Sequence, residues 1–178
     1  MSKLKVVLII IVVFIVIFIA VSFIAKYVFN QIVEEEIEEL FSKVKNEGEI
    51  VTKEDIAELP LNVKRWLEYT GIVGKEKIVS VHVKQKADMR LEKDKPWMPV
   101  EAEQYFTTDE PGFIWKANIK AAPLFHISGR DKYENGKGNM LIKILSLFTV
   151  ADSKGKEIDQ GTLLRYLAET MWFPTAAL

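Results

Sequence analysis

An uninterrupted apolar run near the amino terminus is the strongest pattern along this chain. Val6 to Ala25 carries no charge, and Ser22 is its only polar residue. A helix of that length spans about 30 Å, which is the hydrocarbon thickness of a bilayer. Strands of globular proteins usually end by about ten residues, so the run predicts a transmembrane helix. We assign residues 1–29 to a transmembrane signal anchor.

The charges that flank the run give the anchor a direction. Lys3, Lys5 and the amino terminus precede it, and Lys26 follows it. By the positive-inside rule the amino terminus is cytoplasmic, and the rest forms an extracytoplasmic domain of a single-pass cell-membrane protein. A cleaved signal peptide is the alternative, with Ala20-Val21-Ser22 as the small-residue site. Signal peptides, however, have shorter apolar regions of about 7–15 residues.

Helical spacing continues beyond the apolar run. Residues 30–46 are typical of a juxtamembrane helical stalk, with acidic side chains such as Glu34 to Glu36 on its outer side. The apolar stripe of the stalk consists of Ile32, Val33, Ile37, Leu40, Phe41 and Val44. We expect the stripe to pack on the protein's own domain and the acidic run to be solvated. A coiled coil is the alternative and would make the stalk a homodimer interface, although the stripe covers less than two heptads.

Two short helices are predicted between the stalk and the next pattern. Thr52 to Asp55 resembles a capping box, so we expect a helix that begins there and ends before Pro60. Asn62 is the predicted cap of a second helix over residues 63–70. Gly71 stands where a left-handed residue would end that helix.

The apolar period then changes from about 3.6 to 2, which marks strands with one apolar and one polar face. Strands are predicted over residues 79–91, 98–107, 113–119, 124–133 and 139–151. Short turns join them, including a hairpin signal at Asn135-Gly136, so the sheet is an antiparallel meander. The last segment is almost wholly apolar. We expect a strand with a bend near Ser146, and a helix is the alternative.

One amphipathic helix follows the sheet. It is predicted over Leu163 to Met171, after a turn at residues 152–156, and Pro174 ends it. The side chains expected to face the sheet are Leu163, Leu164, Leu167, Ala168 and Met171. The predicted fold class is therefore α+β, with a curved, half-barrel-like antiparallel sheet packed on this helix. Residues 47–178 form the extracytoplasmic domain.

Composition narrows the range of partners and chemistries. Without Lys3, Lys5 and Lys26, the chain has 21 basic residues against 25 acidic ones, which argues against a nucleic-acid partner. Cysteine is absent, which excludes disulfides and thiolate metal sites. Ser128 lies between His126 and Asp131, but the Gly-x-Ser-x-Gly pattern of a nucleophile elbow is missing. We assign no catalytic residue, no metal ligand and no cofactor.

Two amides stand out among the predicted inward positions. Gln85 and Gln104 fall in register with apolar residues on adjacent strands. An unpaired buried amide costs roughly 1–3 kcal/mol, so these side chains must pair with each other, with Arg165, Tyr166 or Glu169, or line a cavity. The aromatic residues of the sheet fit either core packing or a ligand site. The candidate ligand pocket consists of Gln85, Trp97, Gln104, Phe106, Trp115, Arg130, Arg165, Glu169 and Trp172.

Three functions are compatible with these patterns. The leading hypothesis is a non-enzymatic, membrane-anchored module that binds a lipid or another hydrophobic ligand in the concavity of the sheet. The second is an envelope scaffold or protein-interaction domain with the stalk as its oligomerisation element. The third is a hydrolase, which requires Arg130, Asp131, Arg165 and Glu169 to converge in a cleft.

Several motifs between Leu59 and the end of the chain carry a family resemblance. They are Leu59-Pro60, Arg65-Trp66-Leu67, Gln104-Tyr105-Phe106, Pro111-Gly112-Phe113, Gly129-Arg130-Asp131, and Arg165 to Glu169 followed by Trp172 to Ala176. With these motifs the chain resembles an uncharacterised family of bacterial and archaeal membrane-anchored proteins, a domain of unknown function. The resemblance implies no activity or catalytic residues, and it implies a chain that is several strands short at its carboxyl terminus. The predicted sheet and helix are also similar to the half-barrel of lipoprotein carriers, which holds acyl chains.

Overall fold

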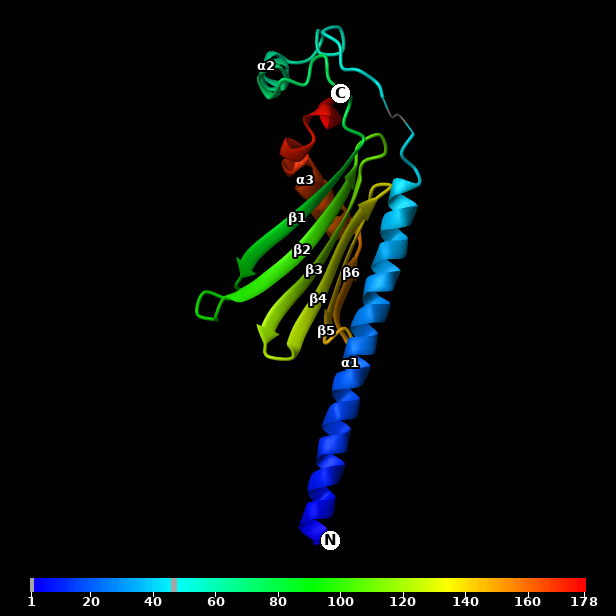
Figure 1. The fold of residues 1–178 in the computed structure, drawn as a ribbon. Coiled ribbons are helices and arrows are strands. Elements are labelled where there is room, and N and C mark those ends of the chain that lie inside the picture. The colour runs from blue at the N-terminus through cyan, green and yellow to red at the C-terminus, as the bar shows by residue number, and fades with distance from the viewer. Residues whose placement is uncertain (1, 46–47) are drawn as a thin grey trace.

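The computed structural model describes residues 2–45 and 48–178. One helix of 39 residues, α1 (Lys3–Phe41), stands beside an open sheet (Figure 1). Its amino-terminal half extends beyond the sheet, and its carboxyl-terminal half lies against it (Figure 1). By length and composition α1 is able to cross a membrane. The predicted anchor and most of the predicted stalk are therefore one uninterrupted helix.

Six strands form a single antiparallel sheet in the order of the sequence, which confirms the predicted α+β class. The strands are β1 (Ser80–Met89), β2 (Met98–Thr107), β3 (Gly112–Ala122), β4 (Phe125–Glu134), β5 (Lys137–Ile144) and β6 (Phe148–Lys154). Successive side chains of a strand point to opposite faces, so each strand offers one set to each face. β1 and β6 are the two edges, and the sheet does not close.

The apolar segment predicted as one bent strand is a hairpin of β5 and β6. The chain reverses at Leu145 and Ser146, which have φ values of 53° and 58°. Neither residue type favours this left-handed conformation, so the residues predicted a bend near Ser146 and not a turn between two strands. β6 also continues to Lys154, through the predicted turn at 152–156. The predicted hairpin at Asn135-Gly136 is confirmed, with φ values of 51° and 74°.

The segment before the sheet holds one helix rather than two. α2 (Leu61–Thr70) starts earlier than expected, so Asn62 lies inside it and makes no cap, whereas Gly71 adopts the predicted left-handed φ of 67°. Thr52 and Asp55 exchange the expected capping bonds, with the Thr52 amide donating to the Asp55 carboxylate at 2.7 Å. Turns follow these bonds instead of a helix.

The last helix faces the sheet with a different side from the predicted one. α3 (Lys156–Ala168) begins before Leu163, and two short 3₁₀ turns, η1 (Thr170–Trp172) and η2 (Pro174–Ala177), follow it. Its buried residues are Thr162 and Tyr166. The predicted inward residue Leu164 is 67% exposed, and Leu163, Leu167 and Met171 are exposed as well. Ala168 also lies on the exposed side.

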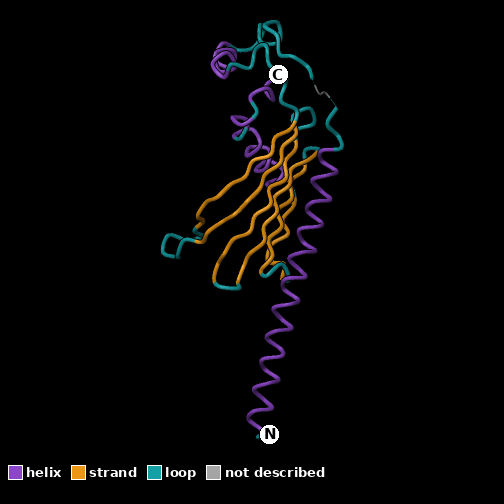
Figure 2. The backbone as a smooth tube through the Cα atoms, in the orientation of Figure 1, coloured by secondary structure: helices purple, strands orange, loops and turns teal. Residues whose placement is uncertain are grey.

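Two apolar clusters on opposite faces hold the sheet between its helices. On one face, Phe29, Val33, Ile37 and Leu40 of α1 pack against Tyr105 and Ile114. On the other face, an aromatic cluster joins Phe106, Phe113, Tyr133, Tyr166 and Phe173. Neighbouring residues of β2 belong to different clusters, so α1 and α3 cover opposite faces (Figure 2). Val33, Ile37, Leu40 and Phe41 of the stalk stripe are thus packed on the sheet, as expected, whereas Ile32 is exposed.

Candidate functional site

Four polar side chains meet on the α3 face, next to the aromatic cluster. The Gln85 amide donates to the Gln104 amide oxygen at 3.1 Å, and the Trp115 ring nitrogen donates to the Gln85 amide oxygen at 2.9 Å. The Gln104 amide in turn donates to the Glu169 carboxylate at 2.6 Å. The two amides therefore pair with each other and with the region that follows α3, which removes the cost of burying them unpaired.

Arg165 of α3 completes this arrangement. Its guanidinium donates to Asp131 at 2.6 Å, to Glu169 at 3.3 Å and to the Gln104 amide oxygen at 3.4 Å. It also lies 5.1 Å from the ring centroid of Trp115, within the range of a cation–π contact. We call Gln85, Gln104, Trp115, Asp131, Arg165 and Glu169 the polar network.

The electrostatics of the polar network are set by burial and by nearby arginines. Burial raises the pKa of Asp131, while the neighbouring Arg165 and Arg130 act in the opposite direction. Asp131 and Glu169 both accept from Arg165, so both carboxylates are engaged by partners within the fold. This arrangement suits docking of α3 onto the sheet better than proton transfer to a substrate.

Five of the nine predicted pocket residues belong to the polar network, and the others lie elsewhere. Phe106 is fully buried in the adjacent aromatic cluster. Trp172 is exposed, and so is Trp97, which stacks on Arg90 beyond the end of β1. Arg130 points to the opposite face. The hydrolase hypothesis needed Arg130 in the same cleft as Asp131. The two residues are consecutive on β4, so their side chains point to opposite faces of the sheet and do not share a cleft.

Arg130 belongs to a set of contacts that fastens α1 to the sheet. Its Nε lies 3.0 Å from the Glu36 carboxylate, and its Nη1 donates to the Asn139 side chain at 2.6 Å. Lys116 pairs with Glu34 in the same way, and Lys43 pairs with Glu134. Part of the acidic run that we expected to be solvated therefore binds the sheet. Sequence spacing gave no sign of these partners.

An uncharged strip lies beyond the polar network on the α3 face. Val100, Ala102, Ala117 and Ile119 form its buried floor, and Met89, Met98, Trp115 and Ile127 pack over them. We call these eight residues the apolar strip. It runs towards the end of the sheet that holds the β1–β2 and β3–β4 turns, whereas Figure 1 places α2 and α3 nearer the other end. The floor is buried beneath its neighbours, and an apolar lining of this kind is a common feature of a binding site for a hydrophobic molecule.

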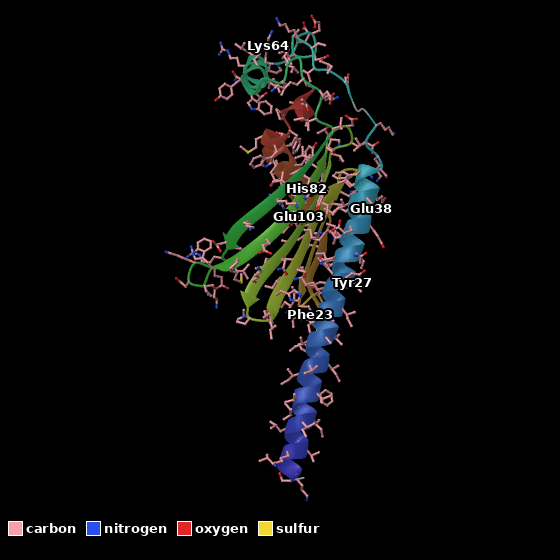
Figure 3. All side chains as sticks on the ribbon, in the orientation of Figure 1. Phe23, Tyr27, Glu38, Lys64, His82 and Glu103 are labelled. Atoms are coloured by element: carbon pink, nitrogen blue, oxygen red, sulfur yellow. The ribbon has the colours of Figure 1, made fainter. Side chains whose placement is uncertain are left out.

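The face that α1 covers has a different surface. A groove of about 650 Å³ runs between α1 and the first three strands. Lys26, Lys84, Lys116, Glu101 and Glu103 are among its lining residues. Close by, His82 lies 2.7 Å from the Glu103 carboxylate and stacks on Tyr105 (Figure 3). Its charged lining suits water and ions, so this groove is a poorer site for an apolar ligand than the apolar strip.

The comparisons with known proteins place the chain in a family. Residues 49–178 match DUF6544, a family of unknown function, and the chain belongs to it. This confirms the resemblance to an uncharacterised family. No significant match was found among the curated proteins or among the solved structures.

Proposed function

We propose that this member of DUF6544 is a membrane-anchored module that binds the acyl chain of a lipid, or a hydrophobe of similar shape, along the apolar strip. One observation carries the proposal. An uncharged strip that crosses four strands runs from the polar network to the end of the sheet nearest the apolar half of α1. A lipid acyl chain that leaves the bilayer would contact apolar side chains along the whole length of the strip.

The exposed half of α1 supports the membrane anchor. Its large apolar side chains from Leu4 to Phe18 are exposed on all sides of the helix. A helix that is apolar all round is stable in hydrocarbon but not in water. Lys3 and Lys5 lie at the amino-terminal end, which favours a cytoplasmic amino terminus and an extracytoplasmic sheet.

The polar network has a defined place in this proposal. It closes the far end of the apolar strip, and its hydrogen bonds hold the Trp115 ring over the strip's floor. The donors and acceptors of the two amides are engaged within the network, so it offers a stable end wall to the strip. The ligand would be selected by its apolar shape and chain length rather than by a charged group.

Photocrosslinking tests the proposal directly. The full chain is reconstituted into vesicles that contain a phospholipid with a diazirine on one acyl chain, and crosslinked peptides are mapped by mass spectrometry. Crosslinks in α1 report the bilayer around the anchor. Crosslinks in peptides of β2 and β3 that carry Val100, Ala102, Ala117 or Ile119 report the strip.

A pair of neighbouring variants supplies the control. Ala117→Asp puts a charge on the strip, whereas Asn118→Asp puts the same charge on the opposite face of β3, where Lys26 lies 2.8 Å from the Asn118 side chain. We expect several-fold weaker strip crosslinking in Ala117→Asp alone. Circular dichroism confirms that each variant is folded. The proposal would be contradicted if crosslinks in the wild-type protein were found only in α1.

A further inference from the structure

We infer that the sheet has its own contact with the bilayer, through the two turns that lie beside α1. These base turns are residues 122–125, between β3 and β4, and residues 145–148, between β5 and β6. The inference requires that α1 spans the membrane. It does not depend on acyl-chain binding by the apolar strip.

Contacts with α1 give the depth of the base turns. The Ser22 hydroxyl donates to the Leu145 carbonyl at 3.2 Å. Ser22 lies three residues inside the end of the apolar run, which corresponds to about 5 Å along the helix axis. The turn after β5 is therefore level with the edge of the hydrocarbon rather than with the water above it.

The turn after β3 lies at a similar depth. A groove of about 420 Å³ separates it from α1, with Phe18, Phe23, Pro123, Leu124 and Phe125 among its lining residues. Figure 3 shows Phe23 beside the lower end of the sheet. Residues of the apolar run thus face the turn directly.

The base turns present large apolar side chains outward. Leu124 is 72% exposed, Phe148 is 56% exposed, and Phe125 and Val150 are exposed beside them. The turns at the other end of the sheet are polar, with Asp109 and Glu110 after β2 and Asn135-Gly136 after β4. Such a difference between the base turns and the turns at the other end is expected if the base turns themselves meet lipid.

The polar groups of the turn after β5 form hydrogen bonds with other groups of the protein. The Leu145 amide donates to the His126 carbonyl at 2.8 Å, and the Leu145 carbonyl accepts from Ser22. The Ser146 hydroxyl lies 2.8 Å from the Ser128 hydroxyl and 3.1 Å from His126 Nε2. Backbone and hydroxyl groups at hydrocarbon depth need such partners, because no water reaches them.

Three lysines lie near the base turns, of which Lys26 and Lys120 also contact Asn118 and Glu101 of the sheet. Lys26 follows the apolar run directly, and Lys120 and Lys143 lie near the ends of β3 and β5. Lysines at this height attract anionic headgroups and extend their charged ends towards water. The chemistry of the surface therefore fits a lipid bilayer with anionic lipid.

Site-directed spin labelling tests the second contact. The chain has no cysteine, so Leu124→Cys and Phe148→Cys each give one labelling site. Asn135→Cys, in a turn at the far end, is the matched control. Each full-length variant is labelled with a nitroxide and reconstituted into vesicles of phosphatidylcholine and phosphatidylglycerol. Collision rates with oxygen and with a water-soluble nickel chelate give the depth.

We expect labels at positions 124 and 148 to have a several-fold higher oxygen-to-nickel ratio than the label at position 135. Circular dichroism and the thermal midpoint show whether each labelled protein is folded. Equal ratios at the three positions in folded protein would overturn the second contact. Strip crosslinking can be lost while these ratios remain high, so the two proposals fail separately.

Discussion

The two faces of the sheet are covered in different ways. The α1 face combines a narrow apolar seam with ion pairs that tie Glu34 and Glu36 to the strands. The α3 face has a dense aromatic cluster, one polar network and then the apolar strip. The comparison teaches that ion pairs and an apolar seam position α1 along the sheet, whereas aromatic packing and one polar network hold α3 and leave the apolar strip beyond it.

The largest expected effect comes from the aromatic cluster. Phe173 is fully buried and its ring centroid lies 4.7 Å from that of Phe106. Phe173→Ala should lower the free energy of unfolding by about 3–5 kcal/mol, because it leaves a cavity among packed rings. Ile37→Val, a smaller deletion in the α1 seam, should cost about 0.5–1.5 kcal/mol. Denaturant unfolding of the detergent-solubilised chain measures both, and a loss below about 1 kcal/mol for Phe173→Ala would contradict the close packing of the aromatic cluster.

A close approach between β5 and α3 gives the next effect. A Cβ atom at Gly138 would lie 2.7 Å from the Ile158 carbonyl oxygen and closer still to the Thr162 hydroxyl. Gly138→Ala should therefore destabilise the fold by about 1–3 kcal/mol through overpacking.

Gly161 is the matched control for this substitution. It lies inside α3 and has open space around its Cβ position. Gly161→Ala should stabilise the protein by roughly 0.5–1 kcal/mol, because alanine is the better helix former. If both substitutions shift the thermal midpoint in the same direction, the result would contradict the close contact between Gly138 and α3.

A smaller effect on the α1 face depends on pH. Burial, followed by the charge of Lys26, lowers the pKa of His126 below its ordinary value of 6.5. The folded state then binds a proton less readily than the unfolded chain. His126 therefore contributes stability that is present above pH 6.5 and is lost as the pH falls through the pKa of the folded state.

The thermal midpoint between pH 7.5 and pH 5.5 measures this contribution. The midpoint of the wild type should fall more on acidification than that of His126→Gln, whose side chain still reaches towards Ser146 but does not titrate in this range. If the midpoint of the wild type falls no more than that of the variant, protonation of His126 does not destabilise the folded state.

Much of the sheet could be predicted because alternation is local. β2 was predicted with its observed ends, and the Asn135-Gly136 hairpin has the conformation that its residue types favour. The β5–β6 hairpin could not be predicted in this way. The residues on both sides of its turn are mostly apolar, and the turn at Leu145 and Ser146 depends on hydrogen bonds to Ser22 and Ser128, far away in the sequence.

The site was predicted in part for the same reason. The alternation placed Gln85, Gln104 and Trp115 on one face, and helical spacing put Arg165 and Glu169 within reach of each other. Arg130 was assigned to the same site, although it is next to Asp131 in the chain and therefore points to the other face. The inward side of α3 was also wrong, because Gly138 brings Thr162 and not Leu163 or Leu164 to the sheet.

By itself, the sequence determined a helix able to cross a bilayer and a meander of strands with one polar and one apolar side. Both follow from short-range periodicity, which does not depend on any partner. Only the tertiary structure decided that Glu34 and Glu36 bind the sheet, that Ser22 holds the turn at Leu145, and that α3 lies near one end of the apolar face. These features join residues far apart in the chain, and packing rather than local pattern selects such contacts.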